Sequence, residues 1–208
     1  MGLISPPTPG WPATLAEGRI GLRPIRYADS AAWTHARRRN AAWLAPWEAT
    51  PPQDDQPPLS FRGMVAFLRR EARAGRMLPF VLTYDGELAG QVTVGGMTWG
   101  SLCSAHVGYW IDERVAGRGV MPTAVALVID HCFAVVGLHR VEVNIRPENV
   151  ASLRVVEKLG LRDEGLRRGL LHIDGAWRDH RSFAVTAEEF PGGLLERWRA
   201  RRGHSVDS

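Results

Sequence analysis

The sequence is poor in cysteine and in lysine, and it lacks any long apolar run. Two cysteines in 208 residues cannot build a disulfide framework, which is consistent with a reducing compartment. No stretch reaches the ~18 consecutive apolar residues that a membrane span requires. Residues 1–20 lack the basic segment and apolar run of a secretory signal. We therefore expect a cytoplasmic protein with no membrane partner.

The positive charge is carried almost entirely by arginine. There are 26 Lys+Arg against 22 Asp+Glu, a net charge of +4, and Lys158 is the single lysine. Arginine favours bidentate contacts with phosphate and carboxylate groups, so the composition is compatible with a phosphorylated ligand or nucleic acid. A GC-rich genome would produce the same bias. The 45% apolar content excludes a wholly disordered chain, and the length favours one domain.

Apolar periodicity, glycines and prolines predict the element order β-α-α-β-β-β-α-β-α-β-β. Strands are expected at residues 19–26, 78–84, 88–99, 102–111, 139–146, 161–173 and 176–186. Helices are expected at 29–40, 60–75, 122–136 and 149–160, with a short basic helix at 194–202. Asp29, Ser60 and Asn149 are the expected N-caps. The predicted organisation is an irregular arm (1–18), one α/β domain (19–190) and a basic tail (191–208), with a mixed sheet.

The strongest local signal is R-V-A-G-R-G at residues 114–119, between an expected strand and an expected helix. Glycines there permit positive φ angles and close approach of a ligand to the backbone. Free N–H groups at a helix N-terminus bind anions, and Arg114 and Arg118 add positive charge. A pyrophosphate is the natural occupant, and a tight turn without a ligand is the alternative. The segment matches neither a Walker loop nor G-x-G-x-x-G.

This segment resembles motif A of the GNAT superfamily of acyl-CoA-dependent N-acyltransferases, [QR]-x-x-G-x-[GA] at a strand–helix junction. Asn149, Ser152 and K-L-G-L at 158–161 match the family's N-x-x-[SA]…LGF segment. Three further segments resemble the RimJ-type members of the family. They are W-L-A-P-W-E at 43–48, G-Y-W-I at 108–111 and I-D-G-A-W-R-D-H at 173–180. The likeness covers residues 19–190.

The resemblance implies the GNAT α/β fold, with a twisted, mixed and mostly antiparallel sheet. About seven strands, splayed at the CoA site, and about four flanking helices are expected. Acetyl-CoA is the implied cosubstrate, its pyrophosphate on the glycine-rich segment and its pantetheine arm on strand 106–111. The implied cofactor-binding residues are Tyr109, Trp110, Ile111, Arg114, Ala116, Gly117, Arg118, Gly119, Val120, Asn149 and Ser152. No metal is expected, because His131 and Cys132 lack partners at ligand spacing.

Acyl transfer from a thioester to an amine needs a base for the amine, an N–H donor for the oxyanion and a proton for the leaving thiolate. The family's tyrosine acid corresponds to Val156 here, whereas RimJ-like enzymes carry a serine at the position of Ser152. Ser152 either donates to the sulfur or only supports the helix N-terminus. The backbone N–H of residues 109–111 is the implied oxyanion donor.

The base for the amine proton is sought on the strand at residues 139–146. Some N-terminal acetyltransferases of the superfamily carry a glutamate at the position of Asn144. Glu142 lies two residues earlier and therefore on the same strand face. We hypothesise that Glu142 and Asn144 act through a water molecule. The alternative is that Glu142 pairs with a neighbouring arginine.

RimJ-type enzymes acetylate protein N-termini, notably the N-terminal alanine of a small-subunit ribosomal protein. The resemblance therefore implies direct acetyl transfer to such an α-amine, with ribosome association possible, by a monomer or homodimer. Aromatic walls with carboxylates would suit an ammonium-bearing peptide. The candidate acceptor-binding residues are Trp43, Trp47, Glu48, Trp177 and Asp179. Their alternatives are core packing for the tryptophans and an arginine ion pair for Asp179.

Three other functions fit parts of the sequence. A GNAT enzyme could acetylate a small amine, such as a polyamine, an amino acid or an aminoglycoside. The arginine-rich tail suggests a nucleic-acid or ribosome-binding module, although no helix-turn-helix, zinc spacing or RNP-like strand accompanies it. A non-catalytic acyl-CoA sensor would bind CoA without releasing a thiol.

Overall fold

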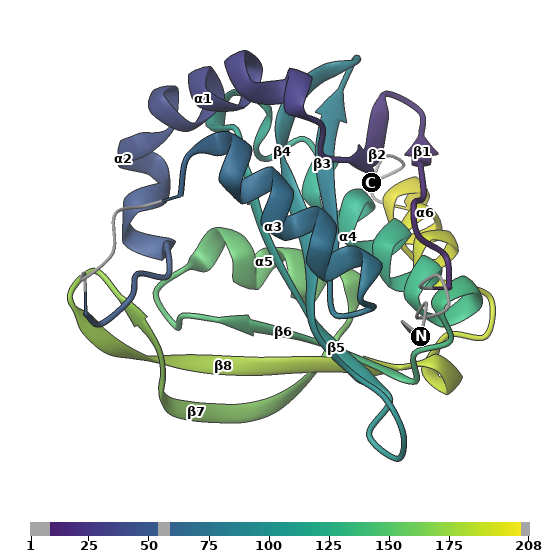
Figure 1. Ribbon diagram of the computed structural model, residues 1–208. Coiled ribbons are helices and arrows are strands. Elements are labelled where there is room, and N and C mark those ends of the chain that lie inside the picture. Colours follow the sequence, from purple (N-terminus) through teal and green to yellow (C-terminus); the bar gives the residue numbers. More distant parts are fainter. Residues whose placement is uncertain (1–8, 54–58, 205–208) are drawn as a thin grey trace, which may run out of the picture.

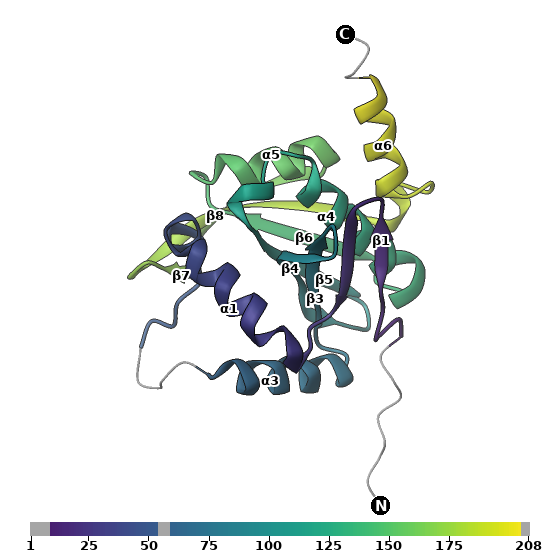
Figure 2. The same cartoon turned by 90° about the horizontal axis from the view of Figure 1, so that it is seen from above.

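The computed structural model describes residues 9–53 and 59–204, which form one sheet with helices on both faces (Figures 1 and 2). The strands are β1 (Leu15–Glu17), β2 (Ile20–Pro24), β3 (Leu78–Tyr84), β4 (Glu87–Thr98), β5 (Ser104–Ile111), β6 (Arg140–Ile145), β7 (Arg162–Ile173) and β8 (Ala176–Thr186). The helices are α1 (Ser30–Arg39), α2 (Ala41–Leu44), α3 (Phe61–Arg73), α4 (Val120–His131), α5 (Val150–Leu159) and α6 (Leu194–His204). Residues 1–8 of the expected arm and 205–208 of the expected tail lie outside the described residues.

The sheet has the strand order β1-β2-β3-β4-β5-β6-β8-β7. Every neighbouring pair is antiparallel except β5 with β6, so the mixed, mostly antiparallel sheet is confirmed. The described residues hold eight strands and six α-helices, slightly more than the sequence predicts. The extra strand, β1, lies within the expected arm and pairs with β2 at the sheet edge.

Local chemistry explains the hairpins and most helix ends. Asp85–Gly86 and Asp174–Gly175 have positive φ angles, as a two-residue hairpin turn requires. Ser60 and Asn149 accept backbone N–H groups at the starts of α3 and α5, as predicted. Asp29 makes no such cap. Its carboxylate instead accepts hydrogen bonds from the Arg23 guanidinium, at 2.8 and 2.9 Å, and from a backbone N–H.

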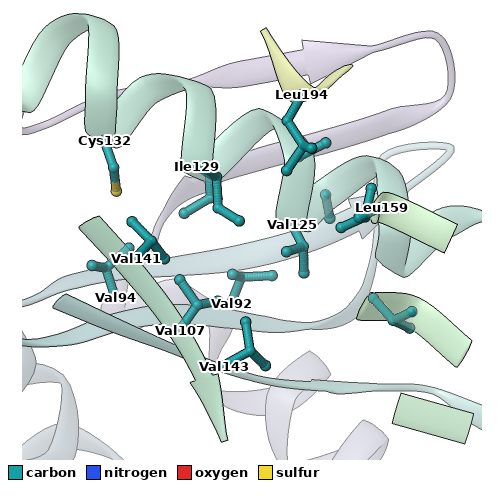
Figure 3. Packing of buried hydrophobic residues seen from close by; sticks show 14 of the residues in the cluster. Val92, Val94, Val107, Val125, Ile129, Cys132, Val141, Val143, Leu159 and Leu194 are labelled. Carbon is teal, nitrogen blue, oxygen red and sulfur yellow. The ribbon is translucent and has the colours of Figure 1, made fainter. Parts of the chain in front are cut away.

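The main core lies between the sheet and α4. In Figure 3, Val125 and Ile129 of α4 face valines of β4, β5 and β6, and these side chains are fully or almost fully buried. A smaller core on the opposite face joins Val81 of β3 to Val65 and Leu68 of α3. β3 is therefore buried on both faces, whereas β6 presents Arg140, Glu142 and Asn144 on the face away from its buried residues.

The feature that positions the site is the parting of β5 from β6. Their parallel pairing covers only residues 104–106 and 140–142, although β5 runs on to Ile111 and β6 to Ile145. Figure 1 shows β5 crossing the direction of β6 where the two separate. The splay that the family resemblance implies is therefore present, and it opens toward the start of α4.

Candidate active site

The glycine loop, residues 114–119, follows the open end of β5. Asp112 accepts the backbone N–H of Arg114 at 3.1 Å, and Asn40 of α1's C-terminal end accepts that of Glu113 at 3.0 Å. Gly117 and Gly119 have φ angles of 79° and 78°, which L-residues with a Cβ rarely adopt. The loop thus leads into the N-terminus of α4 through two glycines with positive φ, as expected for an anion-binding loop.

Asp112 fixes the base of this loop. Its side chain is 1% exposed and forms ion pairs with Arg39 and Arg114. Burial acts to raise the pKa of Asp112, but hydrogen bonds from these arginines outweigh it and lower that pKa to about 2. The Arg114 guanidinium is therefore held by Asp112 beside the loop.

A cavity of about 690 Å³ lies where the glycine loop, β5 and α5 meet. Most of the predicted cofactor-binding residues line it: Tyr109, Trp110, Ile111, Ala116, Gly117, Gly119, Val120, Asn149 and Ser152. Arg114 and Arg118 do not. The positive side chains that line it are Arg37, Arg154 and Lys158. Arg154 and Lys158 lie one turn apart on α5, and neither is among the residues predicted from the sequence to bind the cofactor.

Tyr109 and Ser152 bring two hydroxyl groups into this cavity. The Tyr109 hydroxyl is buried and is the one side-chain polar atom of the described residues that is buried without a hydrogen-bond partner. Burial raises the pKa of the Tyr109 phenol, and the neighbouring Ser152 hydroxyl opposes this rise. An unpaired buried hydroxyl costs about 1–3 kcal/mol, so a ligand atom that pairs with it would be favoured. The sequence indicates a role only for the backbone of Tyr109, because no local pattern shows that its hydroxyl is buried beside Ser152.

Three of the five predicted acceptor-binding residues also line the cavity: Trp43, Trp47 and Glu48. The Trp43 indole N–H donates to the carbonyl of Ile111 at 3.2 Å, on the edge of β5 that β6 has left. Glu48 is ion-paired with Arg37. The Arg146 guanidinium lies over the Trp47 ring, with its Cζ atom 5.4 Å from the ring centre. The α1–α2 region therefore closes one side of the cavity.

The other two acceptor candidates lie outside the cavity lining, on the β7–β8 hairpin. The Trp177 side chain is 61% exposed and packs edge-on against His172. Asp179 accepts the backbone N–H of Gly169 at 2.8 Å, so it braces the hairpin; no ion pair with a neighbouring arginine is among its contacts in the described structure. Their part in acceptor binding stays a prediction.

Glu142 and Asn144, the predicted base relay, do not line the cavity either. Glu142 accepts a hydrogen bond from Arg140 at 2.9 Å and lies 3.2 Å from Arg167. Asn144 accepts one from the Ser182 hydroxyl at 2.6 Å. The arginine pairing considered for Glu142 is therefore present. His106 is level with Glu142 on β5; burial lowers the pKa of His106, and the Glu142 charge opposes this shift.

Within residues 9–53 and 59–204, no three His, Cys, Asp or Glu side chains gather as a metal site would require. Over the same residues, none of the helices combines the length and apolarity needed to cross a bilayer.

Comparisons with known proteins agree with this architecture. The structure of Mycobacterium smegmatis RimJ in complex with CoA-disulfide has a TM-score of 0.87 and 44% identity, covering 93% of this chain and 96% of that one. The Escherichia coli [ribosomal protein uS5]-alanine N-acetyltransferase is 25% identical over 86% of this chain and 93% of its own length. A probable N-acetyltransferase of Bacillus subtilis, YjcK, is 40% identical over 49% of this chain and 56% of its own.

The model of the acetyltransferase (GNAT) domain matches residues 19–162, well over half of the chain. This match covers β2 to the start of β7, and so includes the parted strands, the glycine loop and the α5 N-terminus. The chain belongs to the acetyltransferase (GNAT) family.

Proposed function

We propose that this protein transfers the acetyl group of acetyl-CoA to the N-terminal amine of a protein, with a ribosomal protein that begins with alanine as the first candidate. One observation carries the proposal: a single cavity joins the glycine loop and the open edge of β5 to the wall formed by Trp43, Trp47 and Glu48. The similarity to RimJ, whose structure contains CoA, and to the uS5-alanine enzyme supports this reading.

The donor end of the cavity fits a phosphorylated, thiol-bearing cosubstrate. Backbone N–H groups at the start of α4 suit a pyrophosphate, and Arg154 and Lys158 add positive charge along α5. The buried Tyr109 hydroxyl needs a polar partner that the described residues do not supply. In this proposal Arg114 acts through Asp112 on the shape of the loop, and Arg118 remains a predicted phosphate contact.

The acceptor end fits an amine on an extended chain. Trp43 and Trp47 provide aromatic faces, and Glu48 provides a carboxylate whose present partner is Arg37. A positively charged α-amine would compete with Arg37 for that carboxylate. We therefore assign recognition of the acceptor's N-terminus to Glu48.

The chemical step requires that the amine nitrogen attack the thioester carbonyl, that the C–S bond break, and that the thiolate take up a proton. Ser152 and Tyr109 are the residues with hydroxyl groups that line the cavity. We assign to these hydroxyls the role of proton donor to the leaving thiolate. Glu142 with Asn144 remains our proposal for removal of the proton from the amine. The N–H groups of residues 109–111 are the proposed oxyanion donors.

The test is thiol release from acetyl-CoA with a panel of acceptors. Peptides should vary in their first four residues, and polyamines, free amino acids and aminoglycosides should be included. We expect turnover with peptides that begin with alanine, and none with the same peptides blocked at the α-amine. Turnover confined to small amines would overturn the assignment of a protein acceptor, and CoA binding without turnover on any amine would identify a sensor.

A further inference from the structure

Helix α6 packs against the helix that carries the glycine loop. Leu194 and Trp198 of α6 are 1% and 7% exposed and join the core around α4. The backbone N–H groups of Leu194 and Leu195 donate to the Asp130 carboxylate of α4, at 2.7 and 3.0 Å. The first turn of α6 is therefore capped by α4 itself, which fixes the direction in which α6 continues.

A chain of hydrogen bonds runs from α6 into the glycine loop. The Trp198 indole N–H donates to the Thr123 hydroxyl at 2.8 Å, in a buried position. The Thr123 hydroxyl donates in turn to the carbonyl of Gly119 at 2.9 Å. An indole nitrogen can only donate, so the Thr123 oxygen is the acceptor of this bond. The Thr123 hydroxyl proton is then free to point toward the Gly119 carbonyl. Trp198 thereby sets the hydrogen bond that holds the last residue of the loop.

The same helix also borders the loop directly. A Cβ placed on Gly119 would lie 3.5 Å from the Trp198 ring and 3.7 Å from the Arg202 guanidinium. Arg202 itself stacks on the Trp198 ring, 5.7 Å from the ring centre. The positive charge of Arg202 is therefore held beside the residue at which the loop becomes α4.

A further contact ties α6 to the other side of the cavity. The Arg201 guanidinium donates to the carbonyls of Glu157 and Lys158, at 3.3 and 2.9 Å, in the last turn of α5. This is the helix that presents Arg154 and Lys158 to the cavity. One short helix thus braces both elements between which phosphate groups would lie.

We propose that α6 is part of the donor-binding site: Trp198 is a positioning residue that holds Gly119 through Thr123, and Arg202 supplies charge to the phosphate-bearing end of the donor. This deepens the proposed function, because it rests on acyl-CoA as the donor, and it is independent of the acceptor's identity. In this proposal the ligand of the arginine-rich helix α6 is a small phosphorylated molecule.

The experiment compares CoA with pantetheine, which lacks every phosphate, by calorimetric binding to the full chain. Replacing Trp198 by Phe keeps the aromatic ring and removes the N–H donor. We expect Trp198→Phe to weaken CoA binding about fivefold, as the loss of one hydrogen bond allows, and to leave pantetheine binding within about twofold. The readout needs no acceptor, so a failed acceptor assignment would leave its meaning unchanged.

Three further variants keep the test decisive if the tryptophan variant folds poorly. Thr123→Val removes the same hydroxyl link and should reproduce the selective loss, whereas Thr123→Ser retains the hydroxyl and should restore CoA affinity. Arg202→Gln should weaken CoA binding about threefold at low salt, with the difference disappearing at high salt. The control is Trp99→Phe. The Trp99 indole also donates to a backbone carbonyl, that of Gly75, but it lies just after the C-terminal end of β4, away from the glycine loop.

A selective loss of CoA affinity at Trp198 and Thr123, absent at Trp99, would support the proposal. Equal weakening of CoA and pantetheine would show that α6 acts on stability alone and would overturn it. Unchanged CoA affinity in Trp198→Phe and Thr123→Val would overturn it as well, and unchanged affinity in Arg202→Gln would remove the charge contribution.

Discussion

The cavity has two walls that are built in different ways. The donor wall consists of the cavity-lining residues within two short stretches, 109–122 and 149–158. The glycines and helix caps of these stretches act within a few residues of the chain, and Asn40 and Trp198 brace the loop from outside. The acceptor wall, Arg37, Trp43, Trp47 and Glu48, is held by contacts with distant parts of the chain, such as the hydrogen bond from Trp43 to Ile111. A locally encoded wall can be recognised from its sequence, whereas a wall assembled by distant contacts is specified only by the folded protein.

The largest expected effect tests whether the donor wall performs chemistry as well as binding. The double variant Ser152→Ala/Tyr109→Phe removes both hydroxyl groups from the cavity. We expect kcat to fall roughly 10³-fold, within the range of general acid catalysis, while KM for acetyl-CoA changes little. Single-turnover thiol release measures this, with Tyr84→Phe, a phenol that does not line the cavity, as the control. Unchanged kcat would restrict the donor wall to binding.

The second test concerns Glu142, which lies outside both walls. Glu142→Gln should lower kcat/KM roughly 10²-fold and remove the acidic limb of the pH–rate profile if the Glu142–Asn144 relay takes the amine proton. Glu164→Gln is the matched control, because Glu164 pairs with the same arginine, Arg140. An unchanged profile in Glu142→Gln would leave the pairs with Arg140 and Arg167 as its whole role.

The third test concerns Asp112, which joins α1 to the glycine loop by pairing with Arg39 and Arg114. Its pKa in the folded protein, about 2, lies below the ordinary 3.8, so the ionised carboxylate stabilises the fold above about pH 4. This contribution is lost as the pH falls toward 2. Asp112→Asn should therefore lower the free energy of unfolding by about 2 kcal/mol at pH 7, and the difference should shrink below pH 4.

Thermal or urea unfolding across this pH range measures the effect. Asp85→Asn, at a pair with Arg19 on the exposed surface, serves as the control and should change stability far less. A difference for Asp112→Asn that stays constant from pH 7 to pH 2 would show that the side chain acts through shape rather than charge.

The fourth test, with a smaller expected effect than the first three, concerns Lys158 of the donor wall. Lys158→Gln should raise KM for acetyl-CoA about fivefold at low ionic strength, with the increase fading as salt is added. Arg168→Gln removes an equal charge from an exposed position on β7 that does not line the cavity, and should leave KM unchanged. Equal effects of the two substitutions would mean that only the net charge of the protein matters.

The comparison of the walls also explains what could be predicted from the sequence. Asn149 caps α5 and Gly160 ends it in the left-handed conformation because both signals act within one helical turn. The R-V-A-G-R-G segment at residues 114–119 predicts the position of the glycine loop in the same way. Parting of β5 from β6 was expected only from the family resemblance, since no local pattern encodes where two strands stop pairing.

The sequence is least informative where contacts with distant residues determine the structure. β1 has three residues and no alternation that would indicate a strand, and it forms by pairing with β2. Asp29 does not cap α1, because Arg23 occupies its carboxylate. Trp47 and Trp177 both lie in segments that resemble RimJ-type enzymes. Trp47 lines the cavity, whereas Trp177 is exposed on the β7–β8 hairpin.

The early end of the β5–β6 pairing has a consequence for how the protein behaves in solution. Beyond His106, β5 keeps peptide groups that β6 does not pair, which makes it an edge strand. Edge strands on the rim of a sheet recruit strands from other molecules and favour aggregation. This edge instead lies between two strands of one sheet, with Trp43 bonded to its last carbonyl. The protein thus keeps its unpaired backbone groups between two strands of its own sheet and not on the outer rim, where strands of other molecules add.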